Sequence, residues 1–149
     1  MIVWKPSVTV AAVIEREGRF LFVQERSEGR LVLNQPAGHL DPGESLLEAC
    51  RREVLEETAH RFDPAGLVGV YRWHYAPKDV TFLRFCFHGT VGQKEDSPLD
   101  KEIVALHWLS VDELQRRKAE HRSPLVQKCV DDFLAGSDFP LEVFSTEYS

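Results

Sequence analysis

The segment GHLDPGESLLEACRREVLEETAH, residues 38–60, predicts a glycine-containing loop that runs into one helix. Ser45 is placed to cap this helix, and Glu48, three residues on, completes a capping box. At roughly 100° per residue, one stripe of the helix is apolar and is expected to face a core. The residues of this stripe are Leu47, Cys50, Val54 and Thr58.

A second face of the same helix gathers three carboxylates. Glu53, Glu56 and Glu57 stand at i, i+3 and i+4, so their side chains are neighbours and repel one another at neutral pH. Solvated helices usually interleave lysines against this repulsion, whereas only Arg51 and Arg52 lie nearby. The helix therefore allows two interpretations, a bound divalent cation with oxygen ligands or an acidic surface helix without a ligand.

The spacing of fixed residues in this segment resembles the Nudix box. Gly38, then Glu44 after five residues, then Arg52-Glu53 after seven, and Glu56-Glu57 agree in type and position. Two final positions depart, since Ala59 replaces a glycine and His60 an aliphatic residue. The glycine lies where the helix ends and often adopts a left-handed conformation, so alanine there is expected to cost about 1 kcal/mol.

The resemblance implies roles for the residues of the box. Glu53, Glu56 and Glu57 would be metal ligands together with the carbonyl oxygen of Gly38, and the cofactor would be Mg²⁺ or Mn²⁺. A carboxylate beside the metal takes a proton from water, and Glu53 and Glu56 are the candidates, with Glu57 bridging metals. Several carboxylates around one metal titrate together, so sequence alone does not choose between them.

Three further residues complete this part of the expected site. In many family members a later loop supplies the base or an extra ligand, and Glu102, before the last expected strand, is the candidate here. The alternative for Glu102 is a solvated loop charge. Glu44 and Arg52 are expected to pair and to hold the loop against the helix, a structural role.

Substrate-binding candidates lie outside the box. Arg84 interrupts an apolar strand between Leu83 and Phe85, so its side chain must reach either a phosphate or a buried acid. The organic half of a substrate would need polar or aromatic side chains near the sheet. The residues considered for substrate binding are Arg84, Arg30, Asn34, Gln35 and Tyr75, with Trp4, Trp73 and His74 also available.

Composition limits the classes of partner. The chain has 149 residues, which predicts one domain, residues 1–149. The box occupies residues 38–60 of this domain, and a polar tail from about residue 137 is expected on the surface. A formal net charge of −6 argues against nucleic acid as partner. Three cysteines without metal-site spacing predict reduced core thiols. Without a signal peptide or a membrane-spanning stretch, a cytoplasmic monomer or homodimer acting on a small molecule is expected.

The pattern of residues predicts strands and helices without regular alternation, and therefore a mixed sheet with helices on both faces. The resemblance implies the same α/β fold, a Nudix-type α/β/α sandwich with a mixed central β-sheet. Expected strands cover 7–15, 19–25, 31–33, 67–75, 80–91 and 103–109, and expected helices beyond the box helix cover 111–119 and 124–134. Ser110 and Ser123 are the predicted caps of these two helices.

Short stretches outside the box resemble the NudJ-type Nudix phosphatases of bacteria. They are KP followed by VTVA at residues 5–11, NQPAGHL at 34–40, TFLRF at 81–85 and RSPLV at 122–126. This resemblance implies hydrolysis of phosphoanhydrides in nucleoside di- and triphosphates, hydroxymethylpyrimidine pyrophosphate and thiamin pyrophosphate.

Two alternatives to this function stay open. A dinucleoside polyphosphate hydrolase is suggested by Tyr75, some sixteen residues past Ala59, and a ligand sensor would keep the fold without catalysis.

Overall fold

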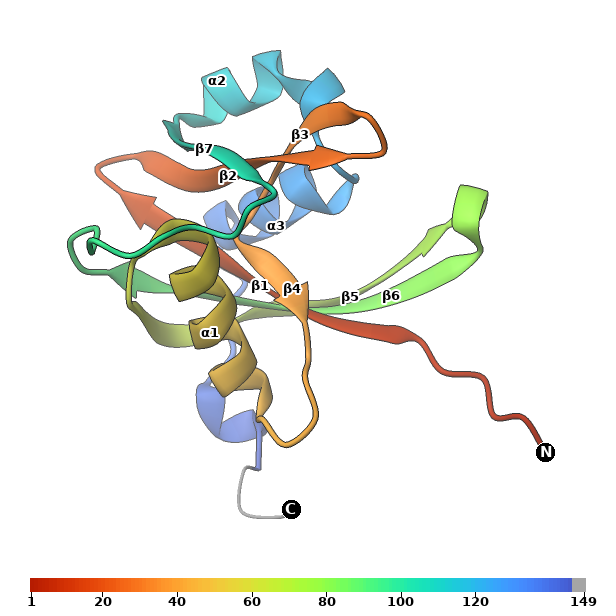
Figure 1. Cartoon of the computed structure of the whole chain (residues 1–149). Coiled ribbons are helices and arrows are strands. Elements are labelled where there is room, and N and C mark those ends of the chain that lie inside the picture. The colour runs from red at the N-terminus through yellow and green to blue at the C-terminus, as the bar shows by residue number, and fades with distance from the viewer. Residues whose placement is uncertain (146–149) are drawn as a thin grey trace.

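A mixed β-sheet lies between helices in the computed structural model, which describes residues 1–145 (Figure 1). The strands are β1 Ser7–Arg16, β2 Arg19–Ser27, β3 Arg30–Asn34, β4 Ala37–His39, β5 Phe62–Tyr75, β6 Val80–Val91 and β7 Ile103–Leu109. The α-helices are α1 Leu46–Thr58, α2 Val111–Arg116 and α3 Leu125–Leu134, with single 3₁₀ turns at Ala76–Lys78, Lys118–Glu120 and Leu141–Val143.

Strand β1 lies at the centre of the sheet. The order is β3-β2-β1-β6-β5, β4 also pairs with β1, and β7 also pairs with β2. The β1–β6 pair is parallel, and the other strand pairs are antiparallel. The expected mixed sheet is therefore confirmed.

Alternating side chains of β1 divide the interior into two cores, as the period of two in a strand requires. Val10, Ala12 and Ile14 pack with the apolar stripe of α1, including Cys50 and Val54. Ala11 and Val13 pack with the buried face of α3 on the opposite side of the sheet. Figure 1 shows the two helices on these two sides. The expected α/β/α arrangement is confirmed.

Several boundaries differ from the sequence expectations. Strand β5 begins at Phe62 rather than at residue 67, since this earlier part of the strand pairs with the end of β6 near Val91. The glycine-containing loop expected at the start of the box begins instead with the short strand β4, which pairs with β1. Helix α2 ends at Arg116 and α3 begins one residue late, after Pro124. Tertiary pairing, which local propensity does not report, explains the two strand differences.

The described part of the tail is less independent than its polar composition suggested. Phe139 exchanges two backbone hydrogen bonds with Leu67 of β5. The ring of Phe144 lies 5.5 Å from the ring of Phe87, between centroids, and covers one end of the α1-side core. Residues 137–145 are therefore part of the packed structure. Within the described chain, no helix combines the length and apolarity needed to cross a membrane.

Helix α1 has the ends that its sequence predicts. Ser45 accepts a hydrogen bond from the backbone N–H of Glu48, and Glu48 in turn accepts one from Ser45, so the capping box is confirmed. Ala59 ends the helix in the left-handed conformation at φ 57°, and its N–H donates to the carbonyl oxygen of Leu55. The methyl group of Ala59 is fully buried, which stabilises the folded protein by about 0.8 kcal/mol. This gain offsets most of the cost of about 1 kcal/mol that alanine has in the left-handed conformation.

Ala59→Val should therefore destabilise the protein by about 2–4 kcal/mol. A β-branched side chain is strained at positive φ, and two more carbon atoms at this fully buried site would press on its neighbours. Ala59→Gly, in contrast, should change the free energy of unfolding by less than about 0.5 kcal/mol because the two terms cancel. Urea unfolding followed by circular dichroism measures both. A stable valine variant would show that Ala59 has more space than the structure gives it.

Candidate active site

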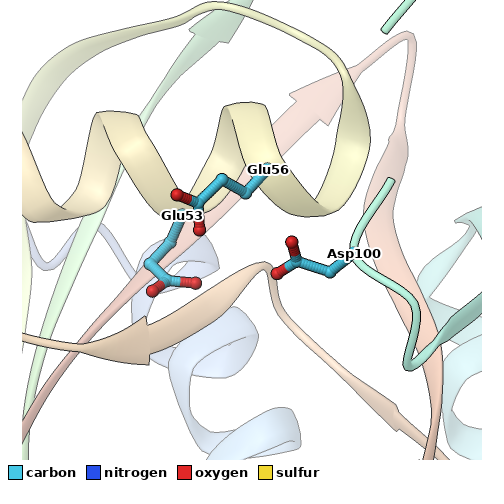
Figure 2. Close-up of side chains that lie close together, drawn as sticks. All are labelled: Glu53, Glu56 and Asp100. Carbon is cyan, nitrogen blue, oxygen red and sulfur yellow. The ribbon is translucent and has the colours of Figure 1, made fainter. Parts of the chain in front are cut away.

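Three carboxylates meet beside helix α1. One oxygen each from Glu53, Glu56 and Asp100 lies within 4.8 Å of the other two. Figure 2 shows the two glutamates descending from α1 and Asp100 approaching from a separate segment of the chain. All three side chains are only partly buried, so the cluster is open to a small ligand from one side.

Asp100 reaches this cluster because its loop is fastened to the end of α1. The N–H of Asp100 donates to the carbonyl oxygen of Glu56 at 2.9 Å, and the N–H of Glu95 donates to that of Ala59 at 2.7 Å. Carbonyl groups in the last turn of a helix have no partner within the helix, so they are free to accept such bonds. The loop between β6 and β7 therefore closes over the acidic face despite the two departures from the box.

Glu102 is placed differently from the expectation. Its side chain is exposed and is not part of the three-carboxylate cluster, while its carbonyl oxygen accepts a hydrogen bond from Arg26 on β2. Asp100, which sequence reasoning passed over, is the residue of this loop that lies in the cluster. The only signal for it was an acidic residue two positions earlier in the same loop, and nothing local distinguishes the two.

Arg52 lies at the centre of the acidic face. Its guanidinium donates to Glu44 at 2.6 and 2.9 Å, to Glu53 at 2.6 Å and to Glu56 at 3.3 Å. It also donates to the carbonyl oxygen of His39 at 2.9 Å, so it joins the loop to the helix. The hydrogen bond from Arg52 holds the pKa of Glu44 below its usual value. One arginine thus faces three glutamates and leaves an excess of negative charge.

Gly38 is required for space rather than for conformation. It lies on β4 opposite Val10 of β1, and an added Cβ atom would stand 2.1 Å from the carboxyl carbon of Glu53. No atom pair tolerates such a distance, so only glycine leaves room for this carboxylate. The backbone of β4 and the side chain of Glu53 are therefore in direct contact.

Glu57 is the most buried acid of the box. Its Oε1 accepts a hydrogen bond from the N–H of Ala37 at 2.9 Å, next to Gly38. Burial raises the pKa of Glu57 to about 9. Burial also raises the pKa of Glu53, even though Arg52 donates to it. Glu57 is not one of the three mutually close carboxylates, although it lines the same cavity as Glu53.

A cavity of about 440 Å³ opens next to this face. Its size is that of a small-molecule site. Acids of the box line one part of it, and Arg84, Asn34, Trp73 and Phe82 line another. The remaining lining residues are Thr9, Glu25, Ala37, Gly38, His39, Asp41, Arg122, Ser123 and Leu125.

The sheet brings Arg84 into this cavity as a buried cation. Its side chain donates to the amide oxygens of Gln35 and Asn34, each at 3.0 Å, and it is 6% exposed. Among the ion pairs of residues 1–145, none involves Arg84. The sequence allowed either a phosphate or a buried acid as the partner of Arg84. Within residues 1–145, Arg84 has no acidic partner.

Two other predicted substrate residues point elsewhere. The Nη1 atom of Arg30 donates to the carbonyl oxygen of Ala119 at 3.3 Å, and Arg30 is exposed. The hydroxyl group of Tyr75 donates to Glu28 at 2.7 Å. Neither Arg30 nor Tyr75 lines the cavity.

The donor set fits a hard divalent cation. Carboxylate oxygens are the ligands that Mg²⁺ and Mn²⁺ prefer, and at least three converge here. A dication would relieve the repulsion that Arg52 leaves unbalanced. The residues present therefore suit the metal that the box implies.

An α/β/α sandwich that gathers carboxylates beside a small-molecule cavity can hold a divalent cation next to an anionic ligand. The model of the NUDIX domain matches residues 4–129, and the chain belongs to the Nudix hydrolase family.

Its relatives agree. Phosphatase NudJ of Escherichia coli strain K12 is 39% identical over 141 residues, which cover 94% of this chain and 91% of that protein. A NUDIX hydrolase from Nitrosomonas europaea is 49% identical, with a TM-score of 0.94 over 97% of this chain and 98% of the other. The fold is also that of a MutT NUDIX hydrolase from Burkholderia pseudomallei, 21% identical, with a TM-score of 0.74 over 87% of this chain and 98% of the other.

Proposed function

We propose that this protein hydrolyses phosphoanhydride bonds in nucleoside di- and triphosphates and in hydroxymethylpyrimidine and thiamin pyrophosphates, with Mg²⁺ or Mn²⁺ as cofactor. The observation that carries the proposal is a single cavity that is lined by carboxylates of the box and also by the buried guanidinium of Arg84. A pyrophosphate needs both parts, since a cation bound to carboxylates offsets its charge and an arginine orients its oxygens.

The chain's own residues have distinct tasks in this proposal. Glu53, Glu56, Asp100 and Glu57, with the carbonyl oxygen of Gly38, would hold the cation. Once bound, the cation would act as a Lewis acid and would lower the pKa of the attacking water molecule. Glu53 or Glu56 then accepts the proton of the attacking water. Arg52 and Glu44 keep the helix and its loop in register.

Arg84 is the proposed phosphate-binding residue. A guanidinium that is buried against two amide oxygens loses hydration without gaining a countercharge, which is costly. A phosphate group in the cavity would provide that countercharge. Asn34 and Gln35 accordingly act on the substrate through Arg84, which they orient.

Likeness to phosphatase NudJ over most of the chain supports the phosphatase assignment. The alternative of dinucleoside polyphosphate hydrolysis loses its one argument, because Tyr75 is engaged with Glu28 outside the cavity. A non-catalytic sensor is not favoured either, since the box carboxylates are all in place. We further propose a single Nudix domain in the cytoplasm, which accords with three buried free cysteines.

Hydrolysis with and without divalent cation, followed by chromatography of all products, tests the proposal, because cleavage of a dinucleotide yields mononucleotides rather than orthophosphate. Hydroxymethylpyrimidine pyrophosphate, thiamin pyrophosphate, GTP and diadenosine tetraphosphate are compared at equal concentration. We expect turnover of the first three with Mg²⁺, loss of most of it with chelator, and recovery when Mg²⁺ is restored in excess. A dominant rate on the dinucleotide would overturn the substrate ranking, and turnover that survives chelation would overturn the role of the cation.

A further inference from the structure

Trp73 on β5 and Phe82 on β6 form a stacked aromatic pair that lines the cavity and is called the aromatic wall below. They face each other across the two strands, their ring centroids lie 5.7 Å apart, and their planes are inclined by 18°. Both side chains are half-buried, and both line the cavity that contains the box acids. We propose that this wall is the binding subsite for a planar heteroaromatic ring of the substrate, a proposal that rests on the function proposed above.

The spacing along β6 relates this wall to the phosphate-binding residue. Phe82 and Arg84 are two residues apart, so they point to the same face of the strand at a separation of about 7 Å. That is the span of one sugar or a short carbon linker between a ring and its first phosphate. The subsite therefore selects heteroaromatic rings joined to the anhydride by such a linker.

The wall is held in place from its outer side. The ring of Tyr75 lies 5.4 Å from that of Trp73, between centroids, and its hydroxyl donates to Glu28. Lys78 pairs with the same carboxylate at 3.0 Å. Strand β1 pairs with β6 only as far as Phe82, so the hairpin beyond it has two strands and projects from the sheet (Figure 1). Glu28 thus braces this hairpin, and a braced wall loses little freedom when a ring binds.

The cavity that the wall lines also has a polar and an apolar side chain from the opposite helix layer. Leu125 and Ser123, from the start of α3, line the same cavity. Stacking supplies affinity for any flat ring, because every base has a π-face.

A matched ligand pair isolates the ring. Guanosine 5′-monophosphate and ribose 5-phosphate share the phosphate and the sugar, and calorimetry with Mg²⁺ measures the affinity of each. We expect the protein to bind the nucleotide at least about 10-fold more tightly. Trp73→Leu should reduce this ratio to about 3 or less, and Trp73→Phe should recover part of it. Trp4→Leu is the control of the same type, since Trp4 is exposed and lies outside the cavity.

The affinity for ribose 5-phosphate, which has no aromatic ring, should change by less than about twofold in Trp73→Leu. Equal affinity for the two ligands in the unchanged protein would overturn the inference, as would a Trp73→Leu variant that weakens both ligands alike. Phe82→Leu provides the same comparison if Trp73→Leu does not fold. The function proposed above fails separately, if no anhydride is hydrolysed in the presence of the cation.

Discussion

Gly38→Ala should lower kcat for phosphate release by about 1,000-fold while leaving the protein folded. The new Cβ atom would stand 2.1 Å from the carboxyl carbon of Glu53, and 2.3 Å from each of its oxygens. Because β4 is hydrogen-bonded to β1 at this position, the backbone does not retreat easily. The carboxylate must move instead, and it leaves the cluster with Glu56 and Asp100. Displacing a group that stabilises charge in a transition state typically costs 100- to 1,000-fold.

Stability should change little, because the clash falls on the free end of a flexible side chain. The ion pair from Arg52 to Glu53 would be lost, yet Arg52 keeps Glu44 and the carbonyl oxygen of His39. A partly exposed pair of this kind contributes about 0.2–1 kcal/mol. We therefore expect the free energy of unfolding, measured in urea, to fall by less than about 1.5 kcal/mol.

Gly92→Ala is the matched control. Gly92 lies in the loop after β6, where an added Cβ atom would meet no atom within 4 Å, and its backbone is not left-handed. Its activity and stability should equal those of the unchanged protein. A fully active Gly38→Ala variant would show that the position of Glu53 does not matter for hydrolysis.

The sequence predicted the box helix well because its signals are local. The capping box at Ser45 and the alternation of apolar and acidic faces on α1 depend on residues three or four positions apart. The contact between Glu44 and Arg52 was expected from the resemblance. The two residues are eight positions apart, with Glu44 in the loop before α1 and Arg52 on α1 itself. These features carry most of the proposed metal site.

Features that depend on distant contacts were not predictable in the same way. Arg84 was expected to meet a phosphate or an acid, and its partners in the structure are Asn34, the last residue of β3, and Gln35, which follows it. Tyr75 was a candidate for substrate binding, whereas its hydroxyl group donates to Glu28, on the turn between β2 and β3. In both cases the deciding residue lies more than forty positions away, and nothing in the local pattern identifies it.

Asp100→Asn should lower kcat by about 100-fold, and Glu102→Gln should change it by less than about twofold. Both variants remove one charge from the same short loop at nearly constant volume, so the comparison tests position alone. Asp100 contributes a carboxylate oxygen to the cluster with Glu53 and Glu56, whereas Glu102 is exposed and outside it.

The asparagine variant should keep its fold, because the loop is fastened by the backbone N–H of Asp100 rather than by its side chain. The role of the Asp100 side chain should also be visible in the dependence of the rate on Mg²⁺. Loss of one carboxylate ligand should raise the Mg²⁺ concentration for half-maximal rate by about 10-fold, as ligand charge sets affinity for a hard cation. Glu102→Gln should leave that concentration unchanged. The opposite ranking, with Glu102→Gln the more damaging, would restore the residue that the sequence first suggested and remove Asp100 from the site.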